Sequence, residues 1–317
     1  MKILVVVDGR PSAFDALSAA AAITARLGAE LGVLVVRSGT LATEEPPPVG
    51  VDIPTGERGQ LPAGIQILLG AVEQLGQAGL LVPPASVKLQ DVPQGYLFAA
   101  AQPTGARVMF CERFGNFIDE VNHEVDANDY DLLVMASPRR GALGRFASMN
   151  LPRRLALDLS CAFLIVRGGS LDSRFVVCAD GSPSSLRIFP LLQKLLPAVK
   201  GPVDLIYARR PDDPKAESDK ALHCLNQAYQ WLTRCGKQVR VLQPEGNKRF
   251  ELILAAAGCD SVIVMGESHM HDIRRRTLGT LGIKVLSRTD SSFLMVKLAN
   301  EPSPFACAAH HDDGLLP

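Results

Sequence analysis

Short apolar runs alternate with helical patterns along the whole chain. Runs such as Phe175–Ala179 and Ser261–Met265 are typical of buried strands, and apolar residues recur at helical spacing over Lys215–Cys235. Strands that alternate with helices are joined by crossovers, which produce a parallel sheet covered on both faces. The pattern therefore predicts an α/β fold.

The predicted elements form two similar sets, one in each half of the chain. In the first half we expect strands at Lys2–Val7, Leu31–Arg37, Asp131–Ala136 and Ala162–Arg167, and helices at Ser12–Leu27, Phe117–Asp126 and near Leu151–Leu157. In the second half we expect strands at Phe175–Ala179, Val203–Ala208, Gln238–Leu242, Ser261–Met265 and Ser292–Leu298, and helices at Pro183–Leu196, Lys215–Cys235, Asn247–Ala257 and around Leu278–Leu286.

The start of each half repeats one motif. An apolar run is followed by Asp8-Gly9-Arg10-Pro11-Ser12 in the first half and by Asp180-Gly181-Ser182-Pro183-Ser184 in the second. A repeat this long, with no short period inside it, indicates two copies of one domain. We expect one domain at 1–169, a second at 173–299 and a disordered tail at 300–317, because the tail is rich in Pro, Ala, His and Asp.

The first copy is longer than the second. Asp8 matches Asp180, and Met135 matches Met265. The first pair is 172 residues apart and the second 130, so the first copy carries 42 extra residues, the difference of these two offsets. The good matches on either side place this insertion within about 40–107.

Two stretches of the first copy have the composition of inserted segments. Thr40–Pro62 is rich in Pro and Gly, which predicts an extended or mobile loop. Leu81–Gln102 contains a candidate short strand at Val87–Val92 and the apolar run Tyr96–Ala101. These stretches could be tolerated surface insertions, or a lid or docking surface with a cavity lined by the apolar run.

Composition narrows the classes of function. Lys plus Arg and Asp plus Glu both number 33, and this zero net charge argues against binding to nucleic acid or to an anionic membrane. The seven cysteines form no CxxC motif, and no charged-then-apolar leader and no long uncharged apolar span is apparent. We therefore expect a cytoplasmic protein with no membrane and no nucleic-acid partner.

The candidate chemistry lies in loops that follow predicted strands. Open parallel sheets bind ligands at the carboxyl ends of their strands. In the second copy, Gly266 ends the fourth predicted strand, and Gly279-Thr280 opens the following helix. Glycine allows the backbone to approach a ligand closely, and the amides of a helix start bind phosphate.

These residues resemble the universal stress protein family, and the resemblance covers both halves except the insertion. The family pattern is G-x2-G-x9-G-[S/T] just after the fourth strand, with an Asp after the first strand that contacts the nucleoside. The resemblance implies five-stranded parallel sheets flanked by helices, of the adenine-nucleotide α-hydrolase-like and Rossmann-like type, two of them in tandem. Members that keep the pattern bind ATP, and members that lose it generally do not.

The pattern transfers differently to the two copies. In the second copy it reads Gly266-x2-His269-x9-Gly279-Thr280, so only the second glycine is replaced, and the tentative nucleotide-binding residues are Asp180, Gly181, Met265, Gly266, His269, Gly279 and Thr280. In the first copy all three glycines are gone, and the degenerate counterpart consists of Asp8, Ala136, Arg139, Met149 and Asn150. We expect ATP or another adenine nucleotide in the second copy only.

Other interpretations of the same residues stay open. Asp8 and Asp180 could cap the following helices instead of contacting a ligand. His269, His271 and Asp272 could be metal ligands, but no further ligand is placed, and we predict no metal. The sequence contains no GxSxG, P-loop or HExxH motif, so we expect no catalytic residues.

Three functions therefore remain. The first is a regulatory role in a stress response with a nucleotide site in the second copy. The second is an interaction protein that binds no nucleotide, and the third is a slow ATP hydrolase. In the family the domains associate through the fifth strand, so we expect Ala162–Arg167 and Ser292–Leu298 to pair within the chain. A homodimer and unknown protein partners stay open.

Overall fold

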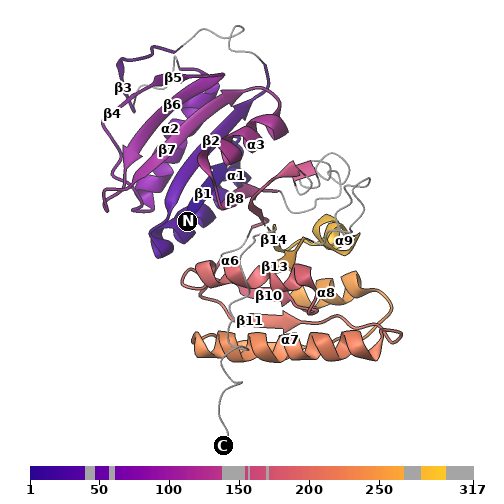
Figure 1. Cartoon of the computed structure of the whole chain (residues 1–317). Coiled ribbons are helices and arrows are strands. Elements are labelled where there is room, and N and C mark those ends of the chain that lie inside the picture. The colour runs from indigo at the N-terminus through magenta and orange to yellow at the C-terminus, as the bar shows by residue number, and fades with distance from the viewer. Residues whose placement is uncertain are drawn as a thin grey trace, which may run out of the picture. The chain divides into compact units, whose positions relative to one another are not determined.

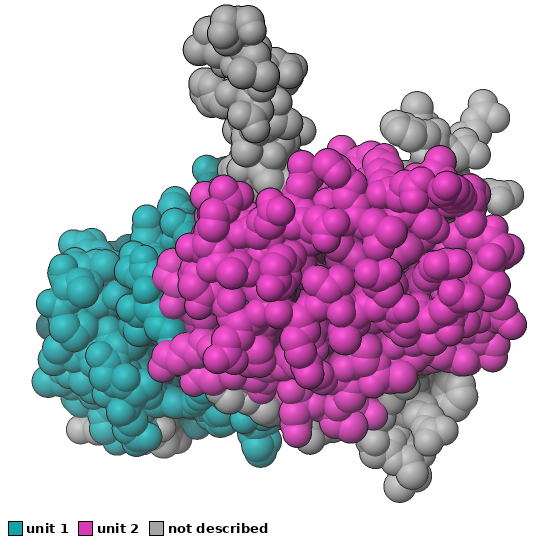
Figure 2. Space-filling view, turned by 90° about the horizontal axis from the view of Figure 1, so that it is seen from below, with its two compact units in different colours: residues 1–138, 158–166 teal, residues 139–157, 167–317 magenta. Residues whose placement is uncertain are grey.

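The computed structural model describes residues 1–39, 47–56, 61–137, 154–155, 158–168, 171–267 and 280–297. The chain divides into two units (Figure 2). Unit 1 comprises Met1–Pro138 and Asp158–Val166, and unit 2 comprises Arg139–Leu157 and Arg167–Pro317. Among the described residues, no helix is both long and apolar enough to cross a bilayer.

Unit 1 is an α/β unit built on one large sheet (Figure 1). Its strands are β1 (Lys2–Val6), β2 (Glu30–Arg37), β3 (Asp52–Pro54), β4 (Ser86–Lys88), β5 (Gln90–Val92), β6 (Gly95–Ala101), β7 (Arg107–Phe114), β8 (Leu132–Ala136) and β9 (Ala162–Val166). Its helices are α1 (Pro11–Leu27), α2 (Ala63–Gln77) and α3 (Phe117–Asn128).

The large sheet of unit 1 has the strand order β9-β8-β1-β2-β7-β6-β5. The five strands from β9 to β7 are parallel, whereas β6 and β5 are antiparallel to their neighbours. The predicted α/β class is confirmed. The predicted count of five strands is wrong for this unit, because the insertion contributes two more strands to the same sheet.

Helices cover both faces of the unit 1 sheet. Adjacent residues of a strand point to opposite faces. The side chain of Glu112 lies beside Gly64 of α2, while that of Arg113 forms an ion pair with Glu124 of α3. Helices α1 and α2 contact each other, so they share the face opposite α3.

The insertion forms a regular extension of unit 1. Strands β3 and β4 form an antiparallel ribbon, and β6 pairs with β7 along seven residues, from Gly95 opposite Arg113 to Ala101 opposite Arg107. Alternate side chains of the predicted apolar run, Tyr96, Phe98 and Ala100, are buried.

Aromatic contacts join strand β6 of this extension to the neighbouring strand β7. Phe98 stacks on Phe110 with ring centroids 4.8 Å apart, and Tyr96 meets Phe114 edge-on at 6.4 Å. Alternate burial is expected of a strand with one covered face. The apolar run is therefore a strand of the sheet, and the burial of its alternate side chains explains why they are apolar.

Unit 2 is an α/β unit with a smaller sheet than unit 1. Its strands are β10 (Arg174–Cys178), β11 (Val203–Ile206), β12 (Val239–Leu242), β13 (Ser261–Gly266) and β14 (Ser292–Val296), and its helices are α5 (Pro183–Leu186), α6 (Ile188–Leu195), α7 (Lys215–Arg234), α8 (Arg249–Ala257) and α9 (Thr280–Arg288). The strand order is β12-β11-β10-β13-β14, and all neighbours are parallel. This is the order of the five parallel strands of unit 1.

One predicted helix of unit 2 is interrupted. The sequence predicts a single helix over Pro183–Leu196, but α5 ends at Leu186 and α6 begins at Ile188. Pro190 explains the break, since it has no N–H to donate to the carbonyl of Leu186 and its ring crowds that carbonyl. The corresponding helix of unit 1, α1, is continuous over 17 residues.

Most of the remaining expectations agree with the structure where it describes them. The candidate strand Val87–Val92 is wrong as a single strand, because β4 and β5 divide it between two sheets. The other predicted elements differ from the observed bounds by one or two residues. Helix α2 and strand β7 were not predicted, and part of the predicted loop at Thr40–Pro62 forms β3. Most of the helix expected near Leu151–Leu157, and the tail at 300–317, lie outside the described residues. The predicted domain bounds stay predictions.

Candidate functional site

The strand order of unit 2 places β10 and β13 side by side at its centre. From β10 the chain crosses to β11 on one side, and from β13 it crosses to β14 on the other. This reversal is a topological switch point, where open α/β sheets bind ligands beyond the carboxyl ends of the strands. The loops that follow β10 and β13 therefore form the candidate site.

The loop after β10 presents a carboxylate to solvent. Asp180 is exposed, and its Oδ1 accepts a hydrogen bond of 3.0 Å from the backbone N–H of Ser182. The N-cap of α5 is Ser182, whose hydroxyl oxygen accepts from the N–H of Ser185 at 3.2 Å. The capping interpretation of Asp180 is therefore wrong. Its Oδ2 has no hydrogen-bond partner among the described residues.

The corresponding carboxylate of unit 1 has a different environment. Asp8 Oδ1 accepts from the backbone N–H of Arg10 at 3.0 Å, which repeats the turn of unit 2. However, Asp8 Oδ2 also lies 3.5 Å from Nε of Arg10. In unit 2, Ser182 stands at the position of Arg10. The second carboxylate oxygen of Asp180 therefore has no arginine two residues along the chain to pair with, unlike that of Asp8.

Glycine is required inside both repeated turns. Gly9 has φ +78° and Gly181 has φ +70°, a left-handed conformation that other residues rarely adopt. A helix also approaches each turn closely: a Cβ on Gly181 would lie 2.9 Å from the carbonyl oxygen of Lys220 in α7. The repeated Asp-Gly is therefore explained by the backbone, and it does not by itself require a ligand.

Gly266 stands where β13 ends and α5 passes. A Cβ at this position would lie 1.9 Å from the carbonyl oxygen of Ser184. The first glycine of the predicted pattern therefore allows two segments of backbone to touch. Met265, next to it, is buried at 6% exposure, so its side chain belongs to the core.

An ion pair closes the ends of the next two strands. Glu267 follows β13 and Lys297 follows β14, and Nζ of the lysine donates to Oε1 of the glutamate at 2.9 Å. Both side chains are at most 10% exposed. Buried charges persist when they are paired, so this pair fixes the carboxyl edge of the sheet.

Two thiols lie near the turn at Asp180. Burial raises the pKa of Cys178, and the Asp180 charge adds to this effect. Burial also raises the pKa of Cys224 to about 11. Both groups are therefore protonated at neutral pH and are not nucleophiles.

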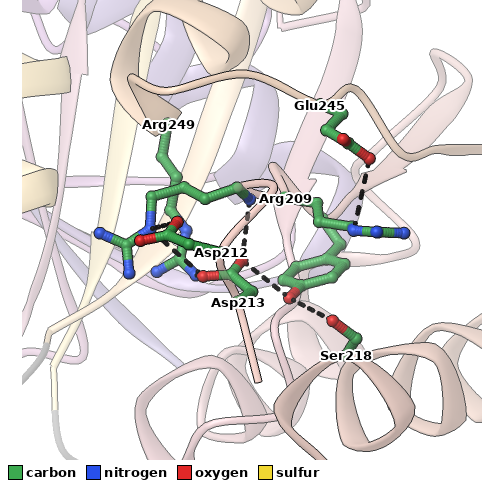
Figure 3. A network of polar contacts seen from close by, with 8 residues as sticks. Arg209, Asp212, Asp213, Ser218, Glu245 and Arg249 are labelled. Atoms are coloured by element: carbon green, nitrogen blue, oxygen red, sulfur yellow. Dashed lines mark hydrogen bonds and ion pairs between the residues drawn. The ribbon is translucent and has the colours of Figure 1, made fainter. Parts of the chain in front are cut away.

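A network of charged side chains lies over the carboxyl ends of β11 and β12 (Figure 3). Its centre is Asp213, whose side chain is fully buried. Asp213 Oδ2 accepts from the Tyr207 hydroxyl at 3.2 Å and from the Arg210 N–H at 2.8 Å. Asp213 Oδ1 accepts from Nη2 of Arg249 at 2.5 Å and from Nε of Arg210 at 3.2 Å.

These contacts control the ionisation of Asp213. Burial by itself raises the pKa of this carboxyl, but the hydrogen bonds from Arg249 and Arg210 outweigh burial and hold the pKa below its usual range. Asp213 is therefore ionised at neutral pH. It joins the loop after β11 to the start of α8.

We expect Asp213→Asn to destabilise unit 2 in a pH-dependent manner. A native pKa below the unfolded value of about 3.9 adds stability that is present above that value and is lost as pH falls through the native pKa. At pH 7 the loss should be about 1.5–3 kcal/mol, as for hydrogen bonds to a charged group. Trp231, the single tryptophan, reports urea unfolding of this unit through its fluorescence.

The pH series separates this effect from a general loss of packing. The difference between wild type and variant should stay constant from about pH 7 to 5 and shrink near pH 4. Asp212→Asn is the matched control, because Asp212 is 76% exposed and should change stability by less than about 0.5 kcal/mol. A difference that is independent of pH would contradict the role given to the Asp213 charge.

The structure brings together some of the predicted site residues. Asp180, Gly181, Met265 and Gly266 lie at the carboxyl ends of the paired strands β10 and β13. Thr280 is the first residue of α9, whereas His269 and Gly279 lie outside the described residues.

In unit 1 the same arrangement is partly described. Asp8 and Ala136 lie at the ends of the paired strands β1 and β8, whereas Arg139, Met149 and Asn150 lie outside the described residues. In the described part of the chain, no group of three or more His, Cys, Asp or Glu could hold a metal ion. His271 and Asp272 lie beyond that part.

The network around Asp213 was not predicted from the sequence. A signal existed, because the charged run Arg209–Asp213 directly follows a strand, where parallel sheets place ligand-binding residues. Its partner Arg249 is 36 residues further along, and no local pattern connects the two.

An open parallel sheet with polar loops at its switch point defines an α/β protein of the Rossmann-like class. The model of the universal stress protein family matches residues 1–167, more than half of the chain, and the protein belongs to this family. Membership implies a role in a stress response. A comparison with curated proteins finds no match.

Solved structures with this fold span the whole chain. A universal stress protein from Archaeoglobus fulgidus DSM 4304 has a TM-score of 0.60 at 16% identity, with 94% of this chain and 97% of that chain covered. A functionally unknown protein from Pseudomonas aeruginosa PAO1 has a TM-score of 0.56 at 13% identity, with 97% and 94% covered. At these identities the likeness supports the fold alone.

Proposed function

We propose that unit 2 is a second universal stress protein domain, that it binds an adenine nucleotide, and that the protein serves a regulatory role in a stress response. The support for a second domain is the repeated strand order together with the repeated Asp-Gly-x-Pro-Ser motif. Equivalent backbone hydrogen bonds recur: Ser137 donates to Val166 and Glu267 to Val296, each at 2.9 Å.

The main support for a nucleotide site in unit 2 is the position of Asp180. It follows the strand at the switch point, is exposed, and has one carboxylate oxygen without a described partner. A carboxylate in this place can accept hydrogen bonds from the hydroxyl groups of a ribose. Gly266 ends the neighbouring strand, at the first position of the nucleotide pattern.

Unit 1 has weaker support for a nucleotide. The Arg10 cation lies 3.5 Å from Oδ2 of Asp8, and Ala136 stands where the pattern requires glycine. We therefore propose that unit 1 binds no nucleotide at this position. The pairing of the two units through their fifth strands, and a homodimer, stay predictions.

We expect Asp180→Asn to weaken the binding of ATP and ADP by about tenfold, because the ligand loses a charge-assisted hydrogen bond. Asparagine keeps an oxygen that can accept from the Ser182 N–H, so the turn is preserved. Isothermal titration calorimetry on the full chain measures the affinity and the stoichiometry.

Asp8→Asn is the matched control in unit 1 and should leave nucleotide affinity unchanged. A loss caused by Asp8→Asn and not by Asp180→Asn would move the site to unit 1. Wild-type protein that binds neither nucleotide would contradict the proposal.

The second candidate function is an interaction protein of the same fold that binds no nucleotide. The observation that favours it is the packing of two glycines of the motifs: Gly181 and Gly266 both lie close to the backbone of neighbouring helices, so neither needs a ligand to explain it. A calorimetric titration that detects no nucleotide binding would favour this candidate.

A further inference from the structure

Arg249 is the first residue of α8 and extends toward the loop after β11 (Figure 3). Its Nη2 donates to Oδ1 of Asp213. Asp213 is itself held by Tyr207 and by Arg210, and Tyr207 is only 4% exposed. The guanidinium therefore has a fixed anchor at one of its nitrogens.

A second nitrogen of the same guanidinium lacks such a contact. Nε of Arg249 is buried and has no hydrogen-bond partner among the described residues. Buried donors are almost always paired in native proteins, and an unpaired one destabilises the fold. A ligand atom that accepts a hydrogen bond at this place would remove the deficit.

Helix α8, which begins at Arg249, packs against β10 and β13, the two strands that end at the candidate nucleotide site. The hydrogen bond from Arg249 to Asp213 is the main cause that raises the pKa of Arg249, and the charge of Asp180 adds to it. Arg249 therefore lies in the field of the carboxylate that follows β10. The planar guanidinium presents several donors in a rigid geometry, so one can stay on Asp213 while another serves a ligand.

The net charge around Arg249 determines whether a charged or an uncharged part of a ligand can bind there. Asp213 pairs with Arg249, the charge of Asp180 acts on it, and Arg210 and Asp212 belong to the same network. Together with Arg249, these groups carry a net negative charge. A phosphate would be repelled here, whereas an uncharged acceptor such as a ring nitrogen or a ribose oxygen would not.

We propose that Arg249 binds the nucleoside part of the nucleotide in unit 2, with its Nε–H donating to an uncharged acceptor atom while Asp213 holds the guanidinium in place. This inference rests on the proposed nucleotide site and adds a contact residue to it. Asp180 and Arg249 then complement each other, since one accepts hydrogen bonds from the nucleoside and the other donates one.

The test measures binding of adenosine, AMP, ADP and ATP to the full chain. We expect Arg249→Met to weaken all four ligands by the same factor, about tenfold, because the lost contact lies on the nucleoside. Arg249→Lys keeps a cation for Asp213 but has no N–H group at the position of Nε, and it should show a similar loss. Trp231 fluorescence verifies that unit 2 is folded in each variant.

Arg209→Met is the matched control. Arg209 belongs to the same network, but it pairs with Glu245 at 3.4 Å and both side chains are 48% exposed. Its replacement should leave all four affinities unchanged.

The outcomes separate this inference from the proposed function. If wild type binds nucleotides and both Arg249 variants bind equally well, the inference fails and the proposed function stands. A loss that grows with the number of phosphates would place Arg249 on the phosphates and overturn the inference. If wild type binds none of the four ligands, the proposed function fails, and this inference with it.

Discussion

Gly266→Ala is expected to lower the free energy of unfolding of unit 2 by about 3 kcal/mol, at the upper end of the cost of overpacking. The added methyl would lie 1.9 Å from the carbonyl oxygen and 2.6 Å from the carbonyl carbon of Ser184. These are backbone atoms, so α5 must move away from β13 as a whole. Urea unfolding followed by Trp231 fluorescence measures the loss.

Gly282→Ala provides the control within the same unit. There the new methyl would lie 3.2 Å from Cε of Met295, the flexible end of a side chain, and alanine favours the helix. We expect its stability to stay within about 1 kcal/mol of wild type. Equal stability of wild type and Gly266→Ala would show that α5 does not lie against the end of β13.

Glu124→Ala is expected to destabilise unit 1 by about 3–5 kcal/mol, because it leaves a buried charge without its partner. Glu124 Oε2 accepts from Nε of Arg113 at 2.9 Å and from its Nη2 at 2.7 Å, and these side chains are 7% and 10% exposed. Glu124 Oε1 accepts from Nδ2 of Asn128 at 2.8 Å. Hydrogen exchange of β7 measures the loss in this unit.

Two further variants test whether this loss comes from the unpaired buried charge of Arg113. The double variant Arg113→Met with Glu124→Leu removes both charges and should recover most of the stability. Glu251→Ala breaks the exposed pair with Lys248, in which the side chains are 63% and 54% exposed, and should cost less than about 1 kcal/mol. A loss below about 1 kcal/mol for Glu124→Ala would mean that solvent screens the Arg113 charge.

Local patterns predicted most of the secondary structure. Buried strands appear as apolar runs, and helices show apolar residues at a spacing of three and four, so elements such as β10 and α7 could be found within two residues of their bounds. The same reasoning could have found α2, in which Ile65, Leu68 and Val72 are buried on one face. The match between the two halves does not reveal α2, because it breaks down across the insertion.

The arrangement of the insertion could not be predicted in this way. The apolar run Tyr96–Ala101 is compatible with a tolerated surface insertion, or with a lid or docking surface that encloses a cavity. The structure places it beside β7, where Phe98 stacks on Phe110 and Tyr96 meets Phe114 edge-on. Strand pairing depends on segments that meet only after folding, so composition alone does not define the partner.

The candidate site was predicted in part. The carboxyl ends of β10 and β13 were identified from the motif at Asp180 and from Gly266, since strand ends follow from the local pattern. The network of Asp213 and Arg249 was missed, because two side chains 36 residues apart meet only in the folded chain, where the start of α8 comes close to the loop after β11.

The sequence by itself determined the α/β class, the internal repeat and the Asp-Gly turn after the first strand of each half, because these depend on periodicity and on the backbone freedom of glycine. Only the tertiary structure showed which groups lie near Asp180, which backbone atoms pack against Gly266, and which strand the insertion pairs with. Those properties depend on contacts between distant segments, whose geometry is set by strand register and helix packing.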